Sequence, residues 1–217
     1  MFQFGIDPRV AVATNMFGLT FMAIGGTIPF LQQGKIDVRR ISPLIVLTII
    51  SSAVGAAIVG LITGEAIKLI VSIAMISVVA FTILQRKSGV EGTQAVSRGA
   101  IVLTFVLTFL LGIYGGLYSG GYVTILTATL VAFFGMTYSE SVASTKLINV
   151  FSSLIATLVF MWQGLVDYKL GLILGLTMFV GAYVGAHYVT KLNEIWVRRI
   201  FLTTVFLLAI KMLYDWV

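Results

Sequence analysis

The sequence predicts an all-α integral membrane protein with about eight membrane segments, arranged as two repeats of a multi-helix unit. Of its 217 residues, 59% are hydrophobic and 10% are charged, whereas about a quarter of the residues in soluble proteins are charged. The mean hydropathy is +1.08. Many apolar runs are long enough to cross a bilayer, which takes about 20 residues in a helix. In addition, the first part of the sequence matches a later part at an offset of 130 residues.

The internal match predicts a duplicated unit, and the matching residues include turns and helix starts. Between residues 4 and 59, fifteen positions carry the same residue 130 positions later, with no gap. They include the pattern QGxxD from Gln33 and the pattern VGA from Val54. Asp7 precedes a proline, as at a helix start, and Thr137 at the matching position opens a capping box. We therefore expect both units to begin a long helix at the same place.

The apolar runs give the order of the predicted segments. In chain order they are 8–32, 41–62, 66–84, 98–118, 122–134, 139–162, 168–190 and 195–214. We divide the chain into a first repeat at 1–85, a cytoplasmic linker at 86–98 and a second repeat at 99–217. The first repeat lacks the two segments that open the second, so we expect it to be truncated.

Basic residues predict the orientation of these segments. They concentrate in three connectors, which are 33–40, 86–98 and 190–199. The positive-inside rule places such connectors in the cytoplasm, so matching loops of the two repeats lie on opposite sides. This favours inverted repeats, in a multi-pass protein of the cell (inner) membrane. The run 122–134 is short for a crossing, and a re-entrant segment there would leave the repeats parallel.

Composition excludes several kinds of site. The chain has no cysteine and one histidine, which leaves no disulfide, no thiolate metal site and no histidine cluster. We expect no metal and no cofactor. The net charge of +6 lies mainly in connectors, which is typical of topology signals and not of nucleic-acid binding. An enzyme within the membrane would need a nucleophile with a base, or a metal set, so we do not expect an enzyme.

Lys146 is the first candidate for substrate contact. It lies nine residues after Thr137, roughly 13 Å into a hydrocarbon core about 30 Å thick. A bare ammonium there costs about 2.5–3.5 kcal/mol. All eight acidic residues lie in connectors or at helix ends, so the lysine has no obvious buried acid partner, which suits an anionic substrate. In the alternative, Lys146 snorkels, deprotonates or is met by polar groups such as Asn149.

The stretch GIYGGLYSGGYVT, residues 112–124, is the second candidate. A chain break at membrane depth must be buried in protein or line a cavity. It would expose the first amides of the next short helix near Gly120, Gly121 and Tyr122, where the helix dipole attracts anions. Glycines also let helices pack closely, and for Ser119 to Gly121 both readings stay open. The packing role is favoured for Gly55, Gly112, Gly115, Gly116 and Gly185.

The third candidate is VATN at 12–15, which matches VAST at 142–145. If the units face each other, Thr14 and Asn15 stand opposite Ser144, Thr145 and Lys146 around one cavity; polar contacts between helices are the alternative. The predicted substrate site is Lys146, Thr145, Ser144, Asn149, Ser119, Gly120, Gly121, Thr14 and Asn15.

The glycine-rich stretch, the helix with ASTK at 143–146 and the loop QGLVDY at 163–168 together resemble the sulfite exporter TauE/SafE family. The resemblance implies a permease for small sulfur-containing anions such as sulfite or sulfonates. Gly120, Gly121 and Lys146 stand at matching positions of the family pattern. The sequence departs from the family pattern in two places. The family usually has a first glycine-rich break ahead of FGIDP, which this sequence does not show. In addition, Ser119 stands where glycine or an apolar residue is frequent, so the substrate can differ.

The sequence therefore predicts a permease with a site near the bilayer midplane, between two repeats that move against each other. Its expected partners are a small anion and the lipid bilayer, with no nucleic acid, and a homo-oligomer is left open. The alternative is a non-transporting or incomplete membrane subunit or scaffold, because the first repeat is truncated.

Overall fold

The computed structural model describes residues 6–67, 69–70, 97–193, 195–197, 199–200 and 203. These residues are helical, with no strand among them, so the all-α class is confirmed. The helices are α1 (Pro8–Gln32), α2 (Val38–Leu61), α4 (Arg98–Leu117), α5 (Tyr122–Phe133), α6 (Tyr138–Trp162) and α7 (Tyr168–Val189). All except α5 are long and apolar enough to cross a membrane. The predicted segments 66–84 and 195–214 fall mainly outside the described residues, so the number of eight stays a prediction.

Side-chain caps fix where the long helices begin. The Asp7 carboxylate accepts a hydrogen bond from the backbone N–H of Arg9. Asp37 and Asp167 cap α2 and α7 in the same way. Thr137 and Glu140 form the predicted capping box at the start of α6. Each cap satisfies amides that have no partner inside the helix.

The helices that the sequence match pairs, α1 with α6 and α2 with α7, begin 130 residues apart. The turns inside the two pairs also agree. Gly34 and Gly164 both adopt left-handed backbone angles, with φ of 63° and 69°, which glycine adopts without a steric penalty. In the same register, Lys35 and Leu165 donate their backbone N–H to carbonyls one turn back in α1 and α6. The division into repeats at 1–85 and 99–217 stays a prediction, because part of each lies outside the described residues.

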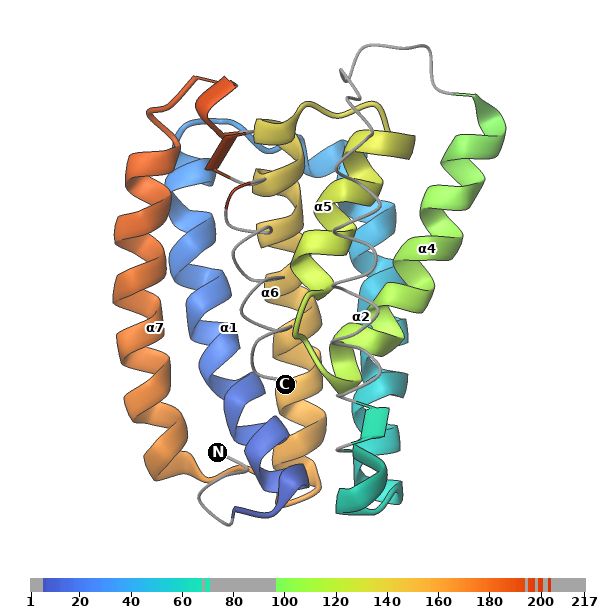
Figure 1. The fold of residues 1–217 in the computed structure, drawn as a ribbon, viewed down its shortest axis with the longest axis vertical. Helices are drawn as coiled ribbons and strands as arrows, with labels where there is room; N and C mark the ends of the chain where they lie inside the picture. Colours follow the sequence, from blue (N-terminus) through green and yellow to red (C-terminus); the bar gives the residue numbers. More distant parts are fainter. Residues whose placement is uncertain are drawn as a thin grey trace.

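The paired helices run in opposite directions (Figure 1). A Cβ built on Gly64, after α2, would lie 3.1 Å from Cδ of Pro8, so α1 begins where α2 ends. Arg40, at the start of α2, donates to the carbonyl of Phe134, so α6 begins near the end of α1. In the packing, α1 contacts α7 and α6, and α2 contacts α4 and α6. The contact between α1 and α7 is therefore equivalent to the contact between α6 and α2, because α1 matches α6 and α7 matches α2.

The short helix α5 begins near half the height of the bundle and returns to the end where α4 begins (Figure 1). Its 12 residues span about 18 Å, roughly half of the hydrocarbon core. The chain therefore enters and leaves the α4–α5 hairpin at one end of the bundle. Because the chain leaves the hairpin at the end where it entered, α6 starts from that end and runs opposite to α1, even though α5 does not cross the whole bundle.

Glycines bring α2 and α4 close together. A Cβ built on Gly55 would lie 2.0 Å from the carbonyl oxygen of Ile113, and one on Gly116 would lie 2.1 Å from that of Ser52. Such distances are possible only without a side chain, so the predicted packing role of these glycines is confirmed. A Cβ built on Gly112 would lie 1.9 Å from Oγ of Ser51 on α2, and one on Gly115 would lie 2.9 Å from the ring of Tyr122 on α5, so these two glycines also have a packing role.

Gly185 differs from its match Gly55. Among the described residues, no atom lies within 4 Å of a Cβ built there. Its predicted packing role stays a prediction, and within the described part of the chain Gly185 has no packing partner. The physical reason is that α7 exposes most of its surface, whereas α2 is enclosed between α4 and α6.

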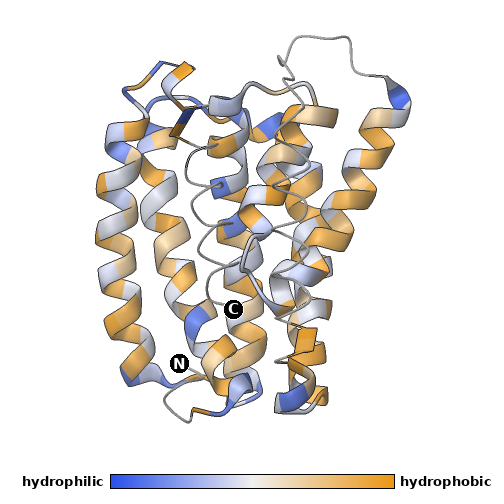
Figure 2. Cartoon of the chain, viewed as in Figure 1, coloured by the Kyte–Doolittle hydropathy of each residue, from blue (hydrophilic) through white to orange (hydrophobic). Residues whose placement is uncertain are grey.

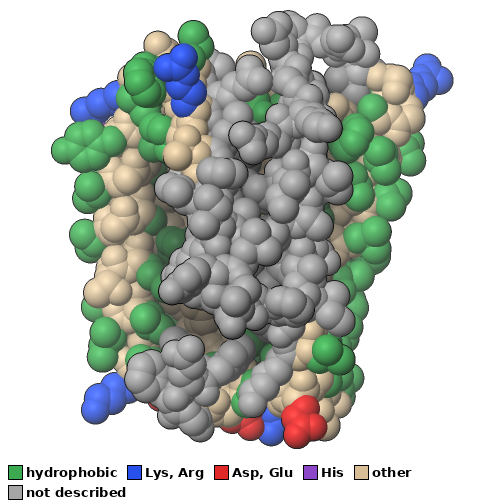
Figure 3. Space-filling model, viewed as in Figure 1, with side chains coloured by type: hydrophobic (Ala, Val, Ile, Leu, Met, Phe, Trp, Pro, Cys, Tyr) green, Lys and Arg blue, Asp and Glu red, His purple; other side chains and the backbone are tan. Residues whose placement is uncertain are grey.

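Charged residues lie near the two ends of the bundle, and hydrophobic side chains cover its sides (Figure 3). Hydrophilic residues also occur on α6 between the ends (Figure 2). One end, here called the basic end, holds the α1–α2 turn, the start of α4, the α5–α6 turn and the end of α7 (Figure 1). Its basic residues include Lys35, Arg39, Arg40, Arg98 and Lys191. The opposite end holds the start of α1 and the α6–α7 turn.

Candidate substrate site

Lys146 lies on α6, eight residues after Tyr138 and about 12 Å from the start of the helix. Its side chain extends between α1 and α7. A Cβ built on Gly26 of α1 would lie 3.5 Å from Cδ of Lys146 and 3.6 Å from Cβ of Ala182 on α7. Within the described part of the chain, the amine takes part in no hydrogen bond or ion pair. Lys146 is thus a candidate contact for a bound anion at the junction of three helices.

A polar stripe on α6 continues from Lys146. Asn149, Ser153 and Thr157 follow it at helical spacing and lie within about 80° of one another around the helix. Asn149 is 3% exposed, and Ser153 is buried as well. The hydroxyl of Thr157 lies 3.0 Å from that of Thr20 on α1, so the stripe faces α1. This interface joins the helix pair α1–α2 to the pair α6–α7.

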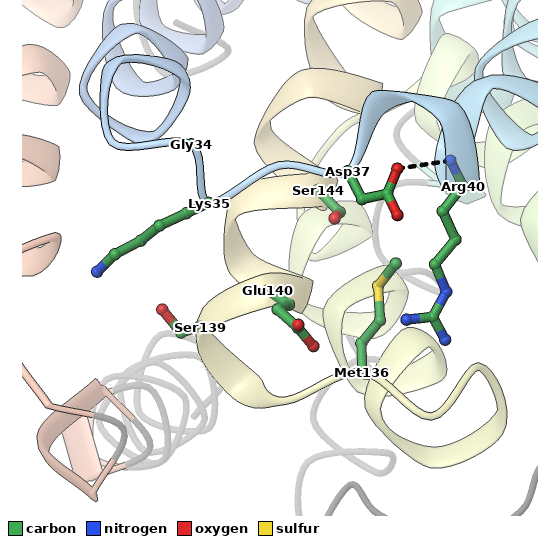
Figure 4. A pocket seen from close by; sticks show the side chains of 8 residues that line it. All are labelled: Gly34, Lys35, Asp37, Arg40, Met136, Ser139, Glu140 and Ser144. Atoms are coloured by element: carbon green, nitrogen blue, oxygen red, sulfur yellow. Dashed lines mark hydrogen bonds between the residues drawn. The ribbon is translucent and has the colours of Figure 1, made fainter.

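A pocket of about 310 Å³ opens at the basic end (Figure 4). The α1–α2 turn, the α5–α6 turn and the first turns of α6 enclose it. Its lining residues are Gly34, Lys35, Asp37, Arg40, Met136, Ser139, Glu140 and Ser144. Ser144 is 1% exposed and lies about 9 Å from the start of α6. The pocket therefore extends from the end of the bundle toward the level of Lys146.

The charged groups of this pocket are already engaged. Lys35 points away from the other labelled side chains in Figure 4 and donates to the carbonyl of Thr190. Arg40 donates to the carbonyl of Phe134 and lies over its ring, 5.0 Å from the centroid. The carboxylate of Glu140 accepts from the Thr137 N–H at 2.9 Å. With two basic and two acidic side chains, the pocket is a polar vestibule and not a strongly positive site.

The structure does not bring Ser144 and Lys146 to one cavity. Residues two apart on an α-helix point about 160° away from each other. Ser144 lines the pocket, whereas Lys146 extends between α1 and α7. Thr145, between them, is fully buried, and its hydroxyl has no hydrogen-bond partner among the described residues.

The predicted position of Thr14 and Asn15 opposite Ser144 is wrong. The hydroxyl of Thr14 accepts a hydrogen bond from the backbone N–H of Asp167, 3.0 Å away in the α6–α7 turn at the opposite end. Because α1 and α6 run in opposite directions, matching residues lie near opposite ends of the bundle. Asn15, next to Thr14, is near that end as well.

The residues Ser119, Gly120 and Gly121 form the predicted chain break between α4 and α5. Gly121 has a φ of 79° and precedes α5, whose first amides receive no side-chain cap. The N–H of Tyr122 donates to the Ser119 carbonyl at 3.2 Å. The nearest atoms to a Cβ built on Gly120 belong to the ring of Tyr118. Anion binding by these amides stays a prediction.

Sequence reasoning missed a group of buried hydroxyls beside the short helix. Ser52 and Ser152 are 2.7 Å apart and join α2 to α6. Ser52 also donates to the carbonyl of Gly112 at 3.0 Å. The hydroxyls of Thr48 and Tyr122 are buried and have no hydrogen-bond partner in the described ranges. The sequence signal that would have revealed this group is the pair Thr48 and Ser52, two polar residues one turn apart in the apolar run 41–62.

Comparison with known proteins decides the family. Residues 1–212 match the sequence profile of the sulfite exporter TauE/SafE. The chain belongs to this family. The predicted resemblance is thereby confirmed, and this TauE/SafE protein is a multi-pass membrane transporter.

Three relatives of this TauE/SafE protein bear names that agree. A probable membrane transporter protein, ORF9, of Sinorhizobium sp. is 26% identical over 97% of this chain and 80% of the relative. The probable membrane transporter protein YfcA of Escherichia coli K12 is 24% identical over 97% of this chain and 78% of its own length. A probable membrane transporter protein of Haemophilus influenzae is 22% identical over 97% and 82%, respectively. No solved structure gives a significant match to the chain.

Proposed function

We propose that this TauE/SafE protein exports a small sulfur-containing anion, such as sulfite or a sulfonate, and that Lys146 is its principal contact. The observation that carries the proposal is the half-buried Lys146 side chain at the junction of α1, α6 and α7, with no acidic partner among the described residues. The family description names sulfite. The relatives' names add transport and no substrate.

The chemistry of Lys146 favours an oxyanion. An ammonium group within the membrane is costly unless an anion lies beside it, and a bound oxyanion supplies that charge. Its several oxygens also need donors. Asn149 carries amide hydrogens one turn from Lys146, and the hydroxyl of Thr145, which has no partner within the described ranges, is a further donor. These groups suit a small anion with several oxygen atoms.

The position of the pocket provides the cytoplasmic entry that export requires. The basic end faces the cytoplasm by the positive-inside rule, so the vestibule that ends at Ser144 admits solute from the cytoplasm. The opposite directions of α1 and α6 suit a transporter whose two halves alternate between inward and outward openings. Ser119, Gly120 and Gly121 stay in the proposal as a second group of donors at the start of α5.

The test is anion flux in liposomes that contain the purified protein. Lys146→Gln should lower sulfite or sulfonate flux by at least about tenfold, because a charge-assisted hydrogen bond is worth about 1.5–3 kcal/mol. Lys146→Arg retains the charge and should retain more flux than Lys146→Gln. Lys169→Gln removes an exposed lysine at the opposite end and should transport like the parent protein.

Two results would contradict the proposal. Flux of Lys146→Gln at the parent level would remove Lys146 from the site. Absence of sulfur-anion flux in the folded parent protein would favour the alternative, a non-transporting or incomplete membrane subunit. Elution of each variant as a single species in detergent shows that it is folded.

A further inference from the structure

The two turns that join the matched helix pairs make different contacts. In the α6–α7 turn, the backbone N–H of Asp167 donates to the hydroxyl of Thr14 on α1 at 3.0 Å. The residues at the matching positions, 130 residues away, are Asp37 in the α1–α2 turn and Ser144 on α6. Asp37 and Ser144 both line the pocket at the basic end, and no hydrogen bond joins them.

A second contact, in contrast, is present at both ends. The side-chain amide of Gln163 donates to the carbonyl of Ala57 near the end of α2, at 3.3 Å. The matching Gln33 donates to the hydroxyl of Thr190, just after α7, at 2.7 Å. Each turn is therefore held to the end of the other pair's second helix. The two ends differ in one contact: the bond from an aspartate N–H to a hydroxyl is present between Asp167 and Thr14 and absent between Asp37 and Ser144.

The donor groups at the two ends are presented alike. Asp37 caps α2 with φ of −81° and ψ of 86°, and Asp167 caps α7 with φ of −79° and ψ of 99°. The acceptors Thr14 and Ser144 are both buried hydroxyls, six residues into α1 and α6. The basic end, where the pocket opens, thus contains the same donor and acceptor groups that form the hydrogen bond at the opposite end.

From this match we infer that Thr14–Asp167 and Ser144–Asp37 are the two gates of the transporter, one closed and one open in this structure. The inference rests on the proposed transport function. When the two helix pairs exchange conformations, the Asp37 N–H bonds to Ser144, the α1–α2 turn moves onto α6 and the pocket closes. The Thr14–Asp167 bond breaks in the same step, which opens the opposite end. A solute in the pocket is then released on the other side of the membrane.

Labelling of one introduced cysteine tests the gates, because the natural chain contains no cysteine. Ser139→Cys places a thiol in the pocket lining, where a water-soluble maleimide reports how often the pocket is open. Thr14→Val removes the acceptor at the closed end and keeps the shape of the side chain. It should slow labelling of Ser139→Cys by up to about fivefold, the change in the equilibrium between the two states that the loss of one net hydrogen bond predicts. Thr14→Ser keeps the hydroxyl and should label at the parent rate.

Labelling of Thr14→Val at the parent rate or faster would overturn the inference. If Thr14→Val does not fold, cross-linking carries the test. Asp37→Cys with Ser144→Cys should form a cross-link in membranes, although the pocket separates these residues here. Thr14→Cys with Asp167→Cys, in direct contact, is the positive control. A cross-link in the control pair and none between positions 37 and 144 would overturn the inference.

These measurements do not depend on the substrate. A labelling rate that responds to Thr14→Val, in protein that moves no sulfite or sulfonate, would support the gates and contradict the proposed substrate. Sulfite flux together with a labelling rate that Thr14→Val does not change would support the proposed substrate and contradict the gates.

Discussion

The Lys146 side chain of α6 lies against Gly26 of α1, where a built Cβ would be 3.5 Å from its Cδ and 3.7 Å from its Cε. These are ordinary van der Waals distances. Gly26 therefore leaves room for the lysine to cross the interface between the two helix pairs. A side chain larger than that of alanine at this position would compete with Lys146 for the same space.

Substitution of Gly26 should change flux according to side-chain size. Gly26→Ala should transport at close to the parent rate, because a methyl group fits at 3.5 Å. Gly26→Leu should displace Lys146 and lower anion flux by at least about tenfold, since small misplacements of a functional group are costly. Flux in liposomes is the measurement. Gly181→Leu is the control, because no described atom lies within 4 Å of a Cβ there; parent-level flux in Gly26→Leu would show that Lys146 does not need this space.

The matched glycines Gly55 and Gly185 should respond in opposite ways to alanine. Gly55→Ala places a methyl group 2.0 Å from the Ile113 carbonyl oxygen and should lower the free energy of unfolding by about 1–3 kcal/mol. Gly185→Ala meets no described atom and should maintain or raise stability, because alanine favours helix by up to about 1 kcal/mol. Thermal unfolding in detergent measures both. Equal melting temperatures would show that α2 and α4 can separate without cost.

The hydroxyl pair Thr20–Thr157 should couple α1 to α6 energetically. The two oxygens are 3.0 Å apart and buried. A double-mutant cycle with Thr20→Val and Thr157→Val should give a coupling of about 0.6 kcal/mol, the average for hydrogen bonds between membrane helices. Thr177→Val is the control, because Thr177 is exposed and bonds within its own helix. Additive losses in the cycle would exclude a direct interaction.

Labelling from outside the cell should show which end faces the cytoplasm. Lys191 is exposed at the basic end, and Lys169 is exposed at the opposite end. A membrane-impermeant maleimide should label Lys169→Cys on intact cells and should label Lys191→Cys only after permeabilisation. The reverse pattern would place the pocket on the outer side and contradict entry of the solute from the cytoplasm in this conformation.

Local sequence signals predicted the ends of the helices well. Asp7 and the Thr137 capping box act as expected, because a cap depends on residues within one turn of the helix start. The glycine-rich break before α5 was also predicted, since its glycines interrupt an apolar run. The candidate site was predicted less well. The sequence match places Thr14 and Ser144 at equivalent positions, but it does not show that opposite helix directions bring them to opposite ends.

The sequence by itself determined that this protein is an all-helical membrane protein of the TauE/SafE family, that its helices begin at recurring caps and that Lys146 lies deep in an apolar helix. These properties depend on composition and on spacing along one helix. Only the tertiary structure decided that Lys146 lies against Gly26, that Ser144 lines a separate pocket and that Thr14 bonds to Asp167. The physical reason is that such contacts depend on the direction and rotation of each helix relative to its neighbours, which are set by packing between residues far apart in the chain.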